Sequence, residues 1–319
     1  MKDKKDIFTS IVGQDAAKNK LKFYLDGYKA TNIIPHIMFV APKGCGKTML
    51  AKATGQYLTA RYDDSRIGKP KKFLELNCST IKNVKQFFNQ VVIPHVHEQE
   101  CTVLFDEASE LPKDVTMALL TILNPNSDNR NTFSYDEYTV DFDFNRQSFM
   151  FATTEAQQIF HALMDRTERI DLEEYSYGQL GEIISRVCEG VTFEETVLDD
   201  MATILRGNAR AAQKMANNIK LFLRAKRREN FTSKDWNGLK KQLGILPLGL
   251  NRIELQVLRY LSERKDCSLT YLSAKTGLTK ACLQRDFEMH LQKMNLMEIT
   301  TAGRALTKQG QSYLQGLAD

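Results

Sequence analysis

An eight-residue segment near the start of the chain constrains the fold more than any other feature. Residues 41–48 read Ala-Pro-Lys-Gly-Cys-Gly-Lys-Thr. Residues 36–40 before it, apolar from Ile37 onward, predict a short buried strand, and residues 49–62 after it carry apolar side chains at helical spacing. A strand, a glycine-bearing loop and a helix form the context in which such a segment binds nucleotide phosphates. An ordinary glycine turn before a helix is disfavoured, because both flanking elements are predicted.

Each residue of this phosphate-binding loop has a distinct expected role. Gly44 and Gly46 let the backbone turn its N–H groups toward phosphate oxygens, and the helix N-terminus adds the positive end of its dipole. Lys47 is expected to reach the outer phosphates, and the Thr48 hydroxyl to hold Mg²⁺. The predicted nucleotide contacts in this segment are Gly44, Cys45, Gly46, Lys47, Thr48 and Met49.

Two carboxylates follow a second apolar strand, residues 101–105. Asp106 is placed to bind the water shell of the metal, and Glu107 to orient and deprotonate the attacking water. An Asp-Glu pair after a strand is common and means little alone. Behind a complete phosphate-binding loop it favours hydrolysis over mere nucleotide binding.

The composition limits the class of protein and its surroundings. The chain has 319 residues, enough for two or three domains, and its net charge of +5 is too small by itself to indicate a nucleic-acid partner. No apolar run reaches membrane-spanning length, and residues 1–6 are charged and lack the apolar stretch of a signal peptide. We therefore expect a cytoplasmic protein with no membrane partner.

Cysteines and basic residues leave alternatives open. The six cysteines are dispersed without metal-ligand spacing, which predicts reduced thiols. Alkylation of Cys45 is expected to impair nucleotide binding, although a small side chain that only fills the loop is equally compatible. Basic side chains are concentrated between residues 206 and 241 and could face phosphate, but a solvated helix face fits this pattern at least as well.

Strand and helix patterns alternate over the first part of the chain. Further strands are predicted at 73–77, 147–152 and 169–172, helices at 84–97 and 115–123, and a loop at 63–72. Such alternation predicts an α/β fold with a parallel sheet covered on both faces.

One segment interrupts this alternation. Between residues 131 and 144, aromatic and polar side chains take turns, which predicts a hairpin that projects from the core. Its aromatic residues are expected to be exposed and to dock a partner.

The second part of the chain has a different pattern. Residues 177–243 are helical without a convincing strand, and residues 244–249 read as a linker. Residues 250–319 predict a separate small domain. It has a helix-turn-helix pair and a β-wing over 296–306 with Gly303 at its tip.

Four polar residues at three places outside the nucleotide motifs suit an oligomeric ATPase. Thr153 and Thr154 follow the strand that ends at Ala152, where a hydroxyl can hold the attacking water. Arg166 is placed to reach the γ-phosphate of a neighbouring subunit, and Arg210 to sense the same phosphate from the helical segment. Arginine suits both tasks because its planar fork matches phosphate oxygens and keeps its charge. Taken singly, each is more often a surface arginine or a capping hydroxyl.

The order and spacing of these motifs resemble an AAA+ ATPase, and within that group the RuvB family of Holliday junction branch-migration motors. Residues 152–154 match sensor 1, residues 163–166 the arginine-finger segment, and residues 207–210 sensor 2. Residues 11–14 match the adenine-side motif, which implies nucleotide contacts for Val12, Gly13 and Gln14, and residues 172–175 match the lid entry, which implies one for Tyr175.

The resemblance implies an architecture, cofactors and partners. It implies an AAA+ parallel-sheet ATPase domain over 1–175, a helical lid over 176–245 and a winged-helix domain over 250–319. ATP and Mg²⁺ are the implied cofactors, with Thr48 and Asp106 at the metal, and Arg304 in the wing is the implied DNA contact. The implied partners are duplex or junction DNA, a homo-oligomeric ring of six subunits, and a RuvA-like protein docked on the 131–144 hairpin.

Several residues depart from the family pattern. Met164 stands where the family has an additional arginine, so Arg166 is expected to act alone. Glu155 stands where it has an arginine after sensor 1, and residues 73–80 are closer to a clamp-loader ATPase. The ATPase chemistry is therefore better supported than the Holliday-junction substrate.

Two functions compete on these grounds. The first is an ATP-hydrolysing DNA motor or helicase, whose catalytic residues are Lys47, Asp106, Glu107, Thr154, Arg166 and Arg210. The second is a clamp-loader-like or assembly-factor switch that acts through a protein partner. A DNA motor is stimulated by DNA alone, whereas a loader needs its protein partner as well.

Overall fold

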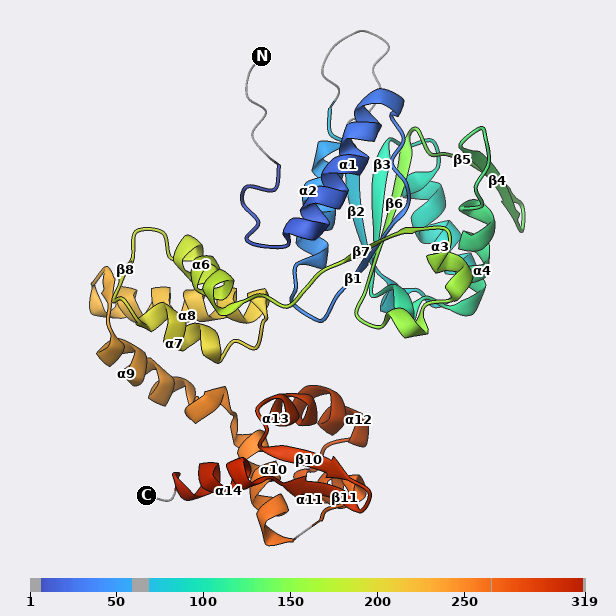
Figure 1. The fold of residues 1–319 in the computed structure, drawn as a ribbon. Helices are drawn as coiled ribbons and strands as arrows, with labels where there is room; N and C mark the ends of the chain where they lie inside the picture. Colours follow the sequence, from blue (N-terminus) through green and yellow to red (C-terminus); the bar gives the residue numbers. More distant parts are fainter. Residues whose placement is uncertain (1–6, 59–68, 265, 318–319) are drawn as a thin grey trace. The chain divides into compact units, whose positions relative to one another are not determined.

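The structure is a computed structural model that describes residues 7–58, 69–264 and 266–317 (Figure 1). It divides into two compact units. The first holds the chain up to Gln179 together with Gly207–Arg210, and the second holds Leu180–Arg206 with the chain from Ala211 onward. Most of the predicted loop at 63–72 lies outside the described residues.

The first unit contains a parallel sheet of five strands in the order β2-β3-β6-β1-β7. The strands are β1 (Ile37–Val40), β2 (Lys72–Asn77), β3 (Cys101–Asp106), β6 (Gln147–Thr153) and β7 (Glu168–Asp171). All of them were predicted, and the parallel α/β sheet is confirmed.

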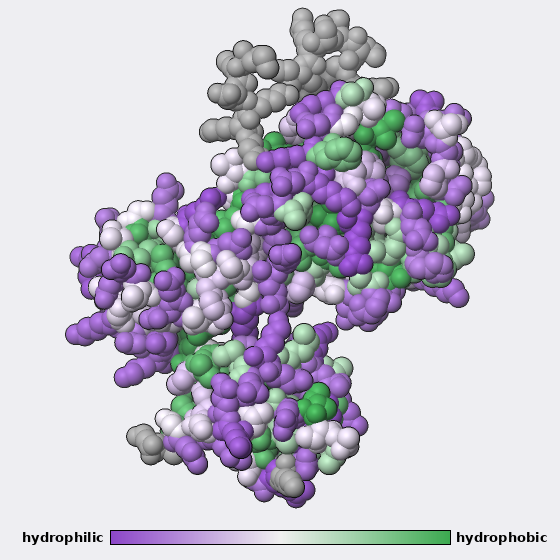
Figure 2. Space-filling model, viewed as in Figure 1, coloured by the Kyte–Doolittle hydropathy of each residue, from purple (hydrophilic) through white to green (hydrophobic). Residues whose placement is uncertain are grey.

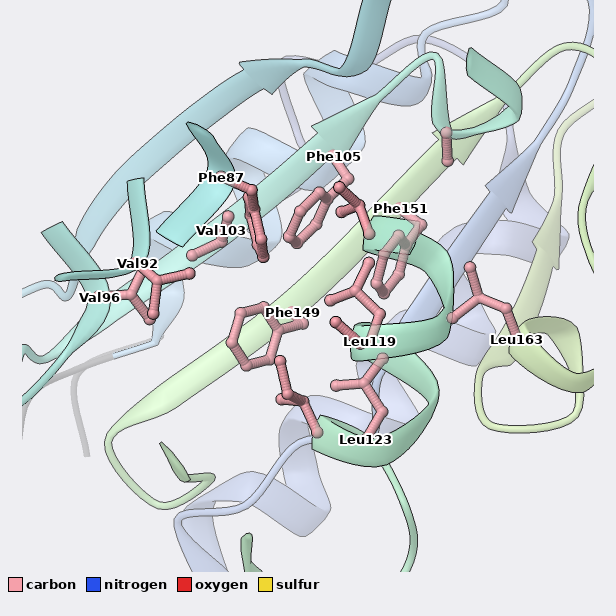
Figure 3. Close-up of a cluster of buried hydrophobic side chains, with 14 of the residues drawn as sticks. Phe87, Val92, Val96, Val103, Phe105, Leu119, Leu123, Phe149, Phe151 and Leu163 are labelled. Atoms are coloured by element: carbon pink, nitrogen blue, oxygen red, sulfur yellow. The ribbon is translucent and has the colours of Figure 1, made fainter. Parts of the chain in front are cut away.

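Alternate residues of the central strands pack into two separate hydrophobic clusters. One cluster contains Val103 and Phe105 of β3 and Phe149 and Phe151 of β6. The second contains the residues between them and beyond, Leu104 of β3 and Met150 and Ala152 of β6. Figure 3 shows the first cluster closed by side chains from α3 and α4. Because a strand buried on both faces reads as a continuous apolar run, these segments could be recognised from sequence.

Helices cover both faces of the sheet (Figure 1). The second cluster is covered by α1 (Asp15–Thr31) and α2 (Lys47–Tyr57). The first is covered by α3 (Val84–Phe87), which continues as a π-helix over Phe88–Val96, by α4 (Lys113–Ile122) and by α5 (His161–Met164). Pro94 lies inside the π-helix.

The predicted hairpin is present as β4 (Arg130–Tyr135) and β5 (Tyr138–Asp143), but its aromatic residues are not exposed. Phe142 is 1% exposed, and Phe133 stacks on Phe88 with ring centroids 5.3 Å apart. The outer face instead carries Thr132, Ser134, Thr139 and Asp141. The prediction of exposed aromatics was wrong, because an alternating pattern identifies two faces without saying which one meets the core.

The second unit begins with a largely helical region. It contains most of α6 (Tyr177–Val187), then α7 (Val197–Thr203), most of α8 (Ala209–Lys226) and α9 (Ser233–Leu243). Two two-residue strands, β8 (Thr192–Phe193) and β9 (Asn230–Phe231), also pair in parallel. The expectation of no strand here was therefore wrong; segments this short give no periodic signal.

A winged-helix fold completes the second unit. After a 3₁₀ turn at Pro247–Gly249, its elements are α10 (Arg252–Glu263), α11 (Leu269–Thr276), α12 (Lys280–Cys282), a π-helical stretch (Leu283–Glu288), α13 (Met289–Lys293), β10 (Met297–Thr300), β11 (Gly303–Leu306) and α14 (Lys308–Gln315). Gly303 starts β11 instead of forming the tip. A β-carbon there would lie 2.5 Å from the Cys267 carbonyl oxygen, which explains the glycine.

The visible face is mostly hydrophilic, with apolar side chains in small scattered groups (Figure 2). Among the described residues, no helix is both long and apolar enough to cross a bilayer.

Candidate nucleotide-binding site

Lys47 lies at the centre of the phosphate-binding loop. Its side chain is 9% exposed, and its ammonium donates to the carbonyl oxygens of Ala41 (2.8 Å) and Pro42 (3.1 Å). Burial lowers the pKa of Lys47, and the nearby carboxylates of Asp106 and Glu107 act against this shift. Within the described part of the chain, the hydrogen bonds of this ammonium go to two neutral carbonyls, and a buried cation held in this way is a favourable partner for a phosphate group.

The metal-binding candidates lie close together at the edge of the sheet where the parallel strands end. The Thr48 hydroxyl lies 3.3 Å from Asp106 Oδ2, although the two residues are 58 positions apart in the chain. Both supply hard oxygen atoms, the ligands that Mg²⁺ prefers. Asp106 Oδ1 also accepts from the Glu107 N–H at 3.0 Å. Glu107 itself is exposed and has a left-handed backbone (φ 57°), so its carboxylate leaves the line of β3.

The loop backbone has the curvature that the glycines were expected to allow. Gly44 and Gly46 have φ angles of 84° and 96°, which strongly favour glycine. The Asn208 amide donates to the Lys43 carbonyl at 3.2 Å, and the Ala209 N–H donates to the Gly44 carbonyl at 3.1 Å. A β-carbon on Gly44 would collide with the Asn208 side chain. Sequence reasoning missed Asn208 as a site residue, although it lies inside the quoted sensor 2 motif.

The residues predicted on the adenine side also lie beside the loop. Gln14 donates to the Glu173 carbonyl at 2.8 Å and lies 3.4 Å from that of Cys45, while Val12 is buried. The Tyr175 hydroxyl is 3.4 Å from the Cys45 carbonyl, and burial raises the pKa of Tyr175.

Gly13 is packed closely by a residue that the sequence did not indicate. A β-carbon on Gly13 would approach the side chain of Gln179 to 2.6 Å. Gln179 also lines a cavity of about 190 Å³ together with Gln14 and Asp15. No motif signals Gln179, because its role depends on the path of α6.

Two further loop residues differ in exposure. Cys45 is 1% exposed, whereas Met49 is 41% exposed on the first turn of α2. The Cys45 thiol is therefore shielded from reagents in the folded chain. Its predicted alkylation effect requires the loop to open first.

The sensor 1 residues end β6 at the same edge of the sheet as Asp106. Asp106 pairs with Ala152 in register, which places Thr154 two residues beyond it. Thr153 is fully buried and its hydroxyl accepts from the Glu155 N–H at 3.0 Å, whereas Thr154 is exposed. This contrast favours Thr154 over Thr153 for contact with a substrate.

The two predicted phosphate-sensing arginines have different environments. Arg210 is exposed at the start of α8 and close enough to Lys47 to contribute to its lowered pKa. Arg166 is part-buried and donates to the Leu120 carbonyl (3.1 Å), the Ala162 carbonyl (2.8 Å) and Asn124 Oδ1 (3.2 Å). A role for Arg166 on a neighbouring subunit requires that these bonds be exchanged.

Arg304, the predicted DNA contact, is engaged within the wing. Its guanidinium forms a two-bond ion pair with Glu288, at 2.9 and 3.1 Å. The side chains of Arg304 and Glu288 are only 14% and 2% exposed. Direct contact of Arg304 with DNA stays a prediction, and it requires this pair to open.

The arrangement brings together the groups needed to bind and hydrolyse a nucleoside triphosphate. The loop residues, Asp106 and Glu107, the adenine-side residues, Thr154 and Arg210 all lie in the first compact unit. Arg166 is also in that unit but bonded elsewhere, and Arg304 belongs to the other one.

Comparison with known families gives two matches. The AAA family (ATPase family associated with various cellular activities) matches residues 37–175. The RuvB C-terminal winged helix domain matches residues 247–315.

Two relatives with similar sequences are both RuvB proteins. The chain is 25% identical over 308 residues to the Holliday junction branch migration complex subunit RuvB of Wolbachia sp. subsp. Brugia malayi, covering 95% of this chain and 90% of the relative. It is 26% identical to the RuvB of Mycoplasmopsis pulmonis, covering 97% and 96%. The solved structure of the Thermotoga maritima RuvB Holliday junction branch migration motor is 20% identical, with a TM-score of 0.75 and 95% coverage of both chains. This last likeness establishes the fold.

Proposed function

We propose that this chain, which matches an AAA ATPase model and a RuvB-type winged-helix model, is a ring-forming motor that hydrolyses ATP to move duplex or Holliday-junction DNA. The observation that carries the proposal is the approach of Thr48 to Asp106 at 3.3 Å beside the buried Lys47. These side chains come from different strand–loop units, and their convergence serves nucleotide chemistry.

The residues present fit ATP and Mg²⁺. ATP with Mg²⁺ would supply the transferable phosphoryl group and the charge that shields it. Lys47 and the N–H groups of residues 44–46 would bind the phosphates, and Thr48 and Asp106 would hold the metal. The Lys47 ammonium has three donors and spends two on loop carbonyls, which suits exchange toward a phosphate oxygen.

The remaining site residues would act on the nucleophile and the charge. Glu107 would accept a proton from the attacking water, because its carboxylate is exposed beside Asp106. The Thr154 hydroxyl would position that water. Arg210 would contribute positive charge near the outer phosphate, and Arg166 would do so on the neighbouring subunit of the ring.

DNA would be gripped through phosphate contacts on the winged-helix domain. Lys280 and Lys293, on the helical run that follows the turn at Gly277, are exposed, as is the tip of the wing. Binding of this kind weakens steeply with salt. A RuvA-like protein on the hairpin would have to use its polar outer face, since the aromatic face packs on the core.

One observation favours the second candidate, a switch that acts through a protein partner. Glu288 neutralises Arg304, the arginine of the wing that the family resemblance assigned to DNA. A wing without a free arginine is compatible with protein docking.

Steady-state ATP hydrolysis tests the proposal. Rates would be measured without DNA, with linear duplex and with a four-way junction, for the wild type, Glu107→Gln, Arg166→Ala and an equal mixture of the variants. Glu110→Gln, an exposed carboxylate three residues beyond Glu107, serves as the matched control and should keep full activity.

The outcomes separate the two functions. Stimulation by DNA, inactive single variants and recovery on mixing would support the shared-site DNA motor. Hydrolysis that ignores every DNA would support the protein-partner switch. Failure of the mixture to recover would leave Arg166 as a residue that acts within its own subunit.

A further inference from the structure

A five-residue segment, Arg206–Arg210, follows α7, runs into the first turn of α8 and contacts residues of both compact units. The division between the two compact units falls inside it, because Arg206 belongs to the second unit and Gly207–Arg210 to the first. Arg206 and Gly207 both have left-handed backbones, with φ angles of 56° and 67°. A non-glycine residue in this conformation is uncommon and persists where its surroundings hold it in place.

On the nucleotide side, Gly207, Asn208 and Ala209 are each bonded to the first compact unit. The Gly207 carbonyl accepts from the Tyr175 N–H at 3.0 Å. The Asn208 amide and the Ala209 N–H hold the carbonyls of Lys43 and Gly44. The position of Arg210 is therefore set by bonds to the phosphate-binding loop itself.

On the other side, Arg206 is bonded to the start of the winged-helix domain. Its guanidinium donates two bonds to Glu254, both at 2.8 Å, and one to the Gly249 carbonyl at 2.9 Å. Glu254 is fully buried, and its Oε2 also accepts from the Asn251 N–H at 2.8 Å, which caps α10. Gly249 packs so closely on Ile204 that a β-carbon would lie 2.6 Å away.

Arg206 and Gly207 are adjacent in the chain, so the two sets of contacts are joined through the backbone. A movement of α10 would displace Glu254, and the two-bond pair would pass that displacement to Arg206, because such a pair is directional and Glu254 is fully buried. From Arg206 it would reach Arg210 through Gly207, which is bonded to Tyr175, and through Asn208 and Ala209, which are bonded to the phosphate-binding loop.

We infer that Arg206 and Glu254 are positioning residues for the segment 207–210, which carries the phosphate-sensing Arg210. Through Arg210 they couple the orientation of the winged-helix domain to ATP hydrolysis. The kinetic part of this inference rests on the proposed ATPase activity. The structural part, the anchoring of residues 207–210 by Glu254, does not.

The chain offers a matched control in the helical region of the second unit. Asp235 is also a buried carboxylate in a capping box, at the start of α9, and it also pairs with an arginine, Arg228. Glu254 and Asp235 are 0% and 5% exposed. Asp235→Asn therefore removes a similar buried pair without touching the 206–210 loop.

The first test compares hydrogen exchange of a peptide containing Ala209 in the full-length wild type, Glu254→Gln and Asp235→Asn. We expect the exchange at Ala209 to rise about tenfold in Glu254→Gln and to stay within about twofold of the wild type in Asp235→Asn, for similar losses of Tm. Equal exchange in the two variants would overturn the inference, whether or not the protein hydrolyses ATP.

The second test is kinetic. Glu254→Gln should lower kcat about tenfold while the KM for ATP changes less than about twofold, because the phosphate-binding loop itself is intact. Added to Arg210→Gln, it should cause no further loss, whereas Asp235→Asn should act independently. Independent effects of Glu254→Gln and Arg210→Gln would overturn the coupling. A wild type that hydrolyses no ATP would overturn the proposed function instead and leave the exchange test to decide the anchoring.

Discussion

The phosphate-binding loop and the wing each contain one cation that the sequence singled out, buried in the loop and part-buried in the wing, yet they hold it in different ways. Lys47 is bonded to neutral carbonyls only, with Asp106 and Glu107 close by. Arg304 is neutralised by a two-bond pair with the buried Glu288. The first arrangement leaves a charge for a ligand, and the second uses the charge inside the fold.

The difference teaches that the residue type alone does not decide whether a cation serves a ligand. Lys47 is directed by local backbone geometry, since the glycines and the helix start lie within four residues of it. Arg304 is directed by a residue 16 positions away, on a helix that packs against the wing. Local determinants can be read in a sequence, whereas distant partners cannot.

The strongest test of the loop replaces Lys47. Lys47→Ala should lower ATP hydrolysis by about a thousandfold, because it removes a charge-assisted contact to the outer phosphates. Lys43→Ala, an exposed lysine of the same loop, should retain activity within about twofold. Steady-state rates and the affinity of a fluorescent nucleotide would measure both. Similar losses in the two variants would show that the loop responds to charge in general.

The nucleotide side was largely predictable. The strands that end at Val40, Asp106 and Thr153 are continuous apolar runs, and the phosphate-binding loop, Asp106, Glu107 and Thr154 lie at or just after their ends. The adenine-side residues were expected only from the family resemblance. Asn208 and Gln179 were missed because their contacts come from the path of the chain after Tyr175. Arg166 was identified by resemblance, but its bonds to the end of α4 could not be anticipated from sequence.

The wing can be tested by breaking its ion pair. Arg304→Gln should destabilise the winged-helix domain by about 3 kcal/mol, because it leaves the Glu288 carboxylate buried without its partner. Arg285→Gln, which breaks an exposed pair with Asp286, should cost less than about 1 kcal/mol. Urea-induced unfolding would measure both.

The same Arg304 variant also tests whether Arg304 differs from Lys47 in not binding a ligand. If Arg304 binds a DNA phosphate, its loss should reduce the salt dependence of DNA binding by about one unit of slope. Such a reduction, without the loss of stability, would show that Arg304 serves a ligand after all.

The wing and the hairpin show that sequence patterns predict an element without predicting the contacts of its side chains. In both, the element was predicted. The exposure of the hairpin aromatics was predicted wrongly, and the ion pair of Arg304 with Glu288 was not foreseen. The hairpin aromatics face the core because the sheet needs cover on that side, which an alternating pattern cannot specify. Gly303 was read as a turn residue, although its function is to let the Cys267 backbone approach.

The buried Asp235 of the helical region gives a further example of a charge used inside the fold, with a smaller expected effect on stability. Burial alone would raise the pKa of Asp235, but hydrogen bonds from Thr232 and Arg228 outweigh it and lower the pKa to about 2. A depressed carboxylate stabilises the fold above its unfolded pKa of about 4, and this contribution is lost as pH falls toward 2. Asp235→Asn should cost about 1 kcal/mol at neutral pH and flatten the pH dependence between these values. Thermal unfolding measured from pH 2 to pH 7 would test this, and the free energy of unfolding contributed by Asp235 should change by about 1 kcal/mol over that range. The same pH dependence of stability in Asp235→Asn and in the wild type would contradict the prediction.

The smallest effect concerns thiols, which again differ between the two regions. Cys45, in the phosphate-binding loop, is 1% exposed, whereas Cys282, on the helix that follows the winged-helix turn, is the one cysteine of the described residues that is not buried. Burial and the hydrogen bond to Asp286 raise the pKa of Cys282, so its labelling should be slow at neutral pH and faster in alkali.

Limited alkylation of the native chain should therefore label Cys282 first and change ATP hydrolysis by less than about twofold. Cys282→Ser should abolish this early labelling and keep the activity. Mass spectrometry of the labelled peptides, followed beside the rate, distinguishes the two sites. Early labelling of Cys45 with loss of activity would show that the phosphate-binding loop opens readily. The loop would then no longer be a rigid site that holds Lys47 ready for a ligand, and its contrast with the wing, where Glu288 pairs with Arg304, would be lost.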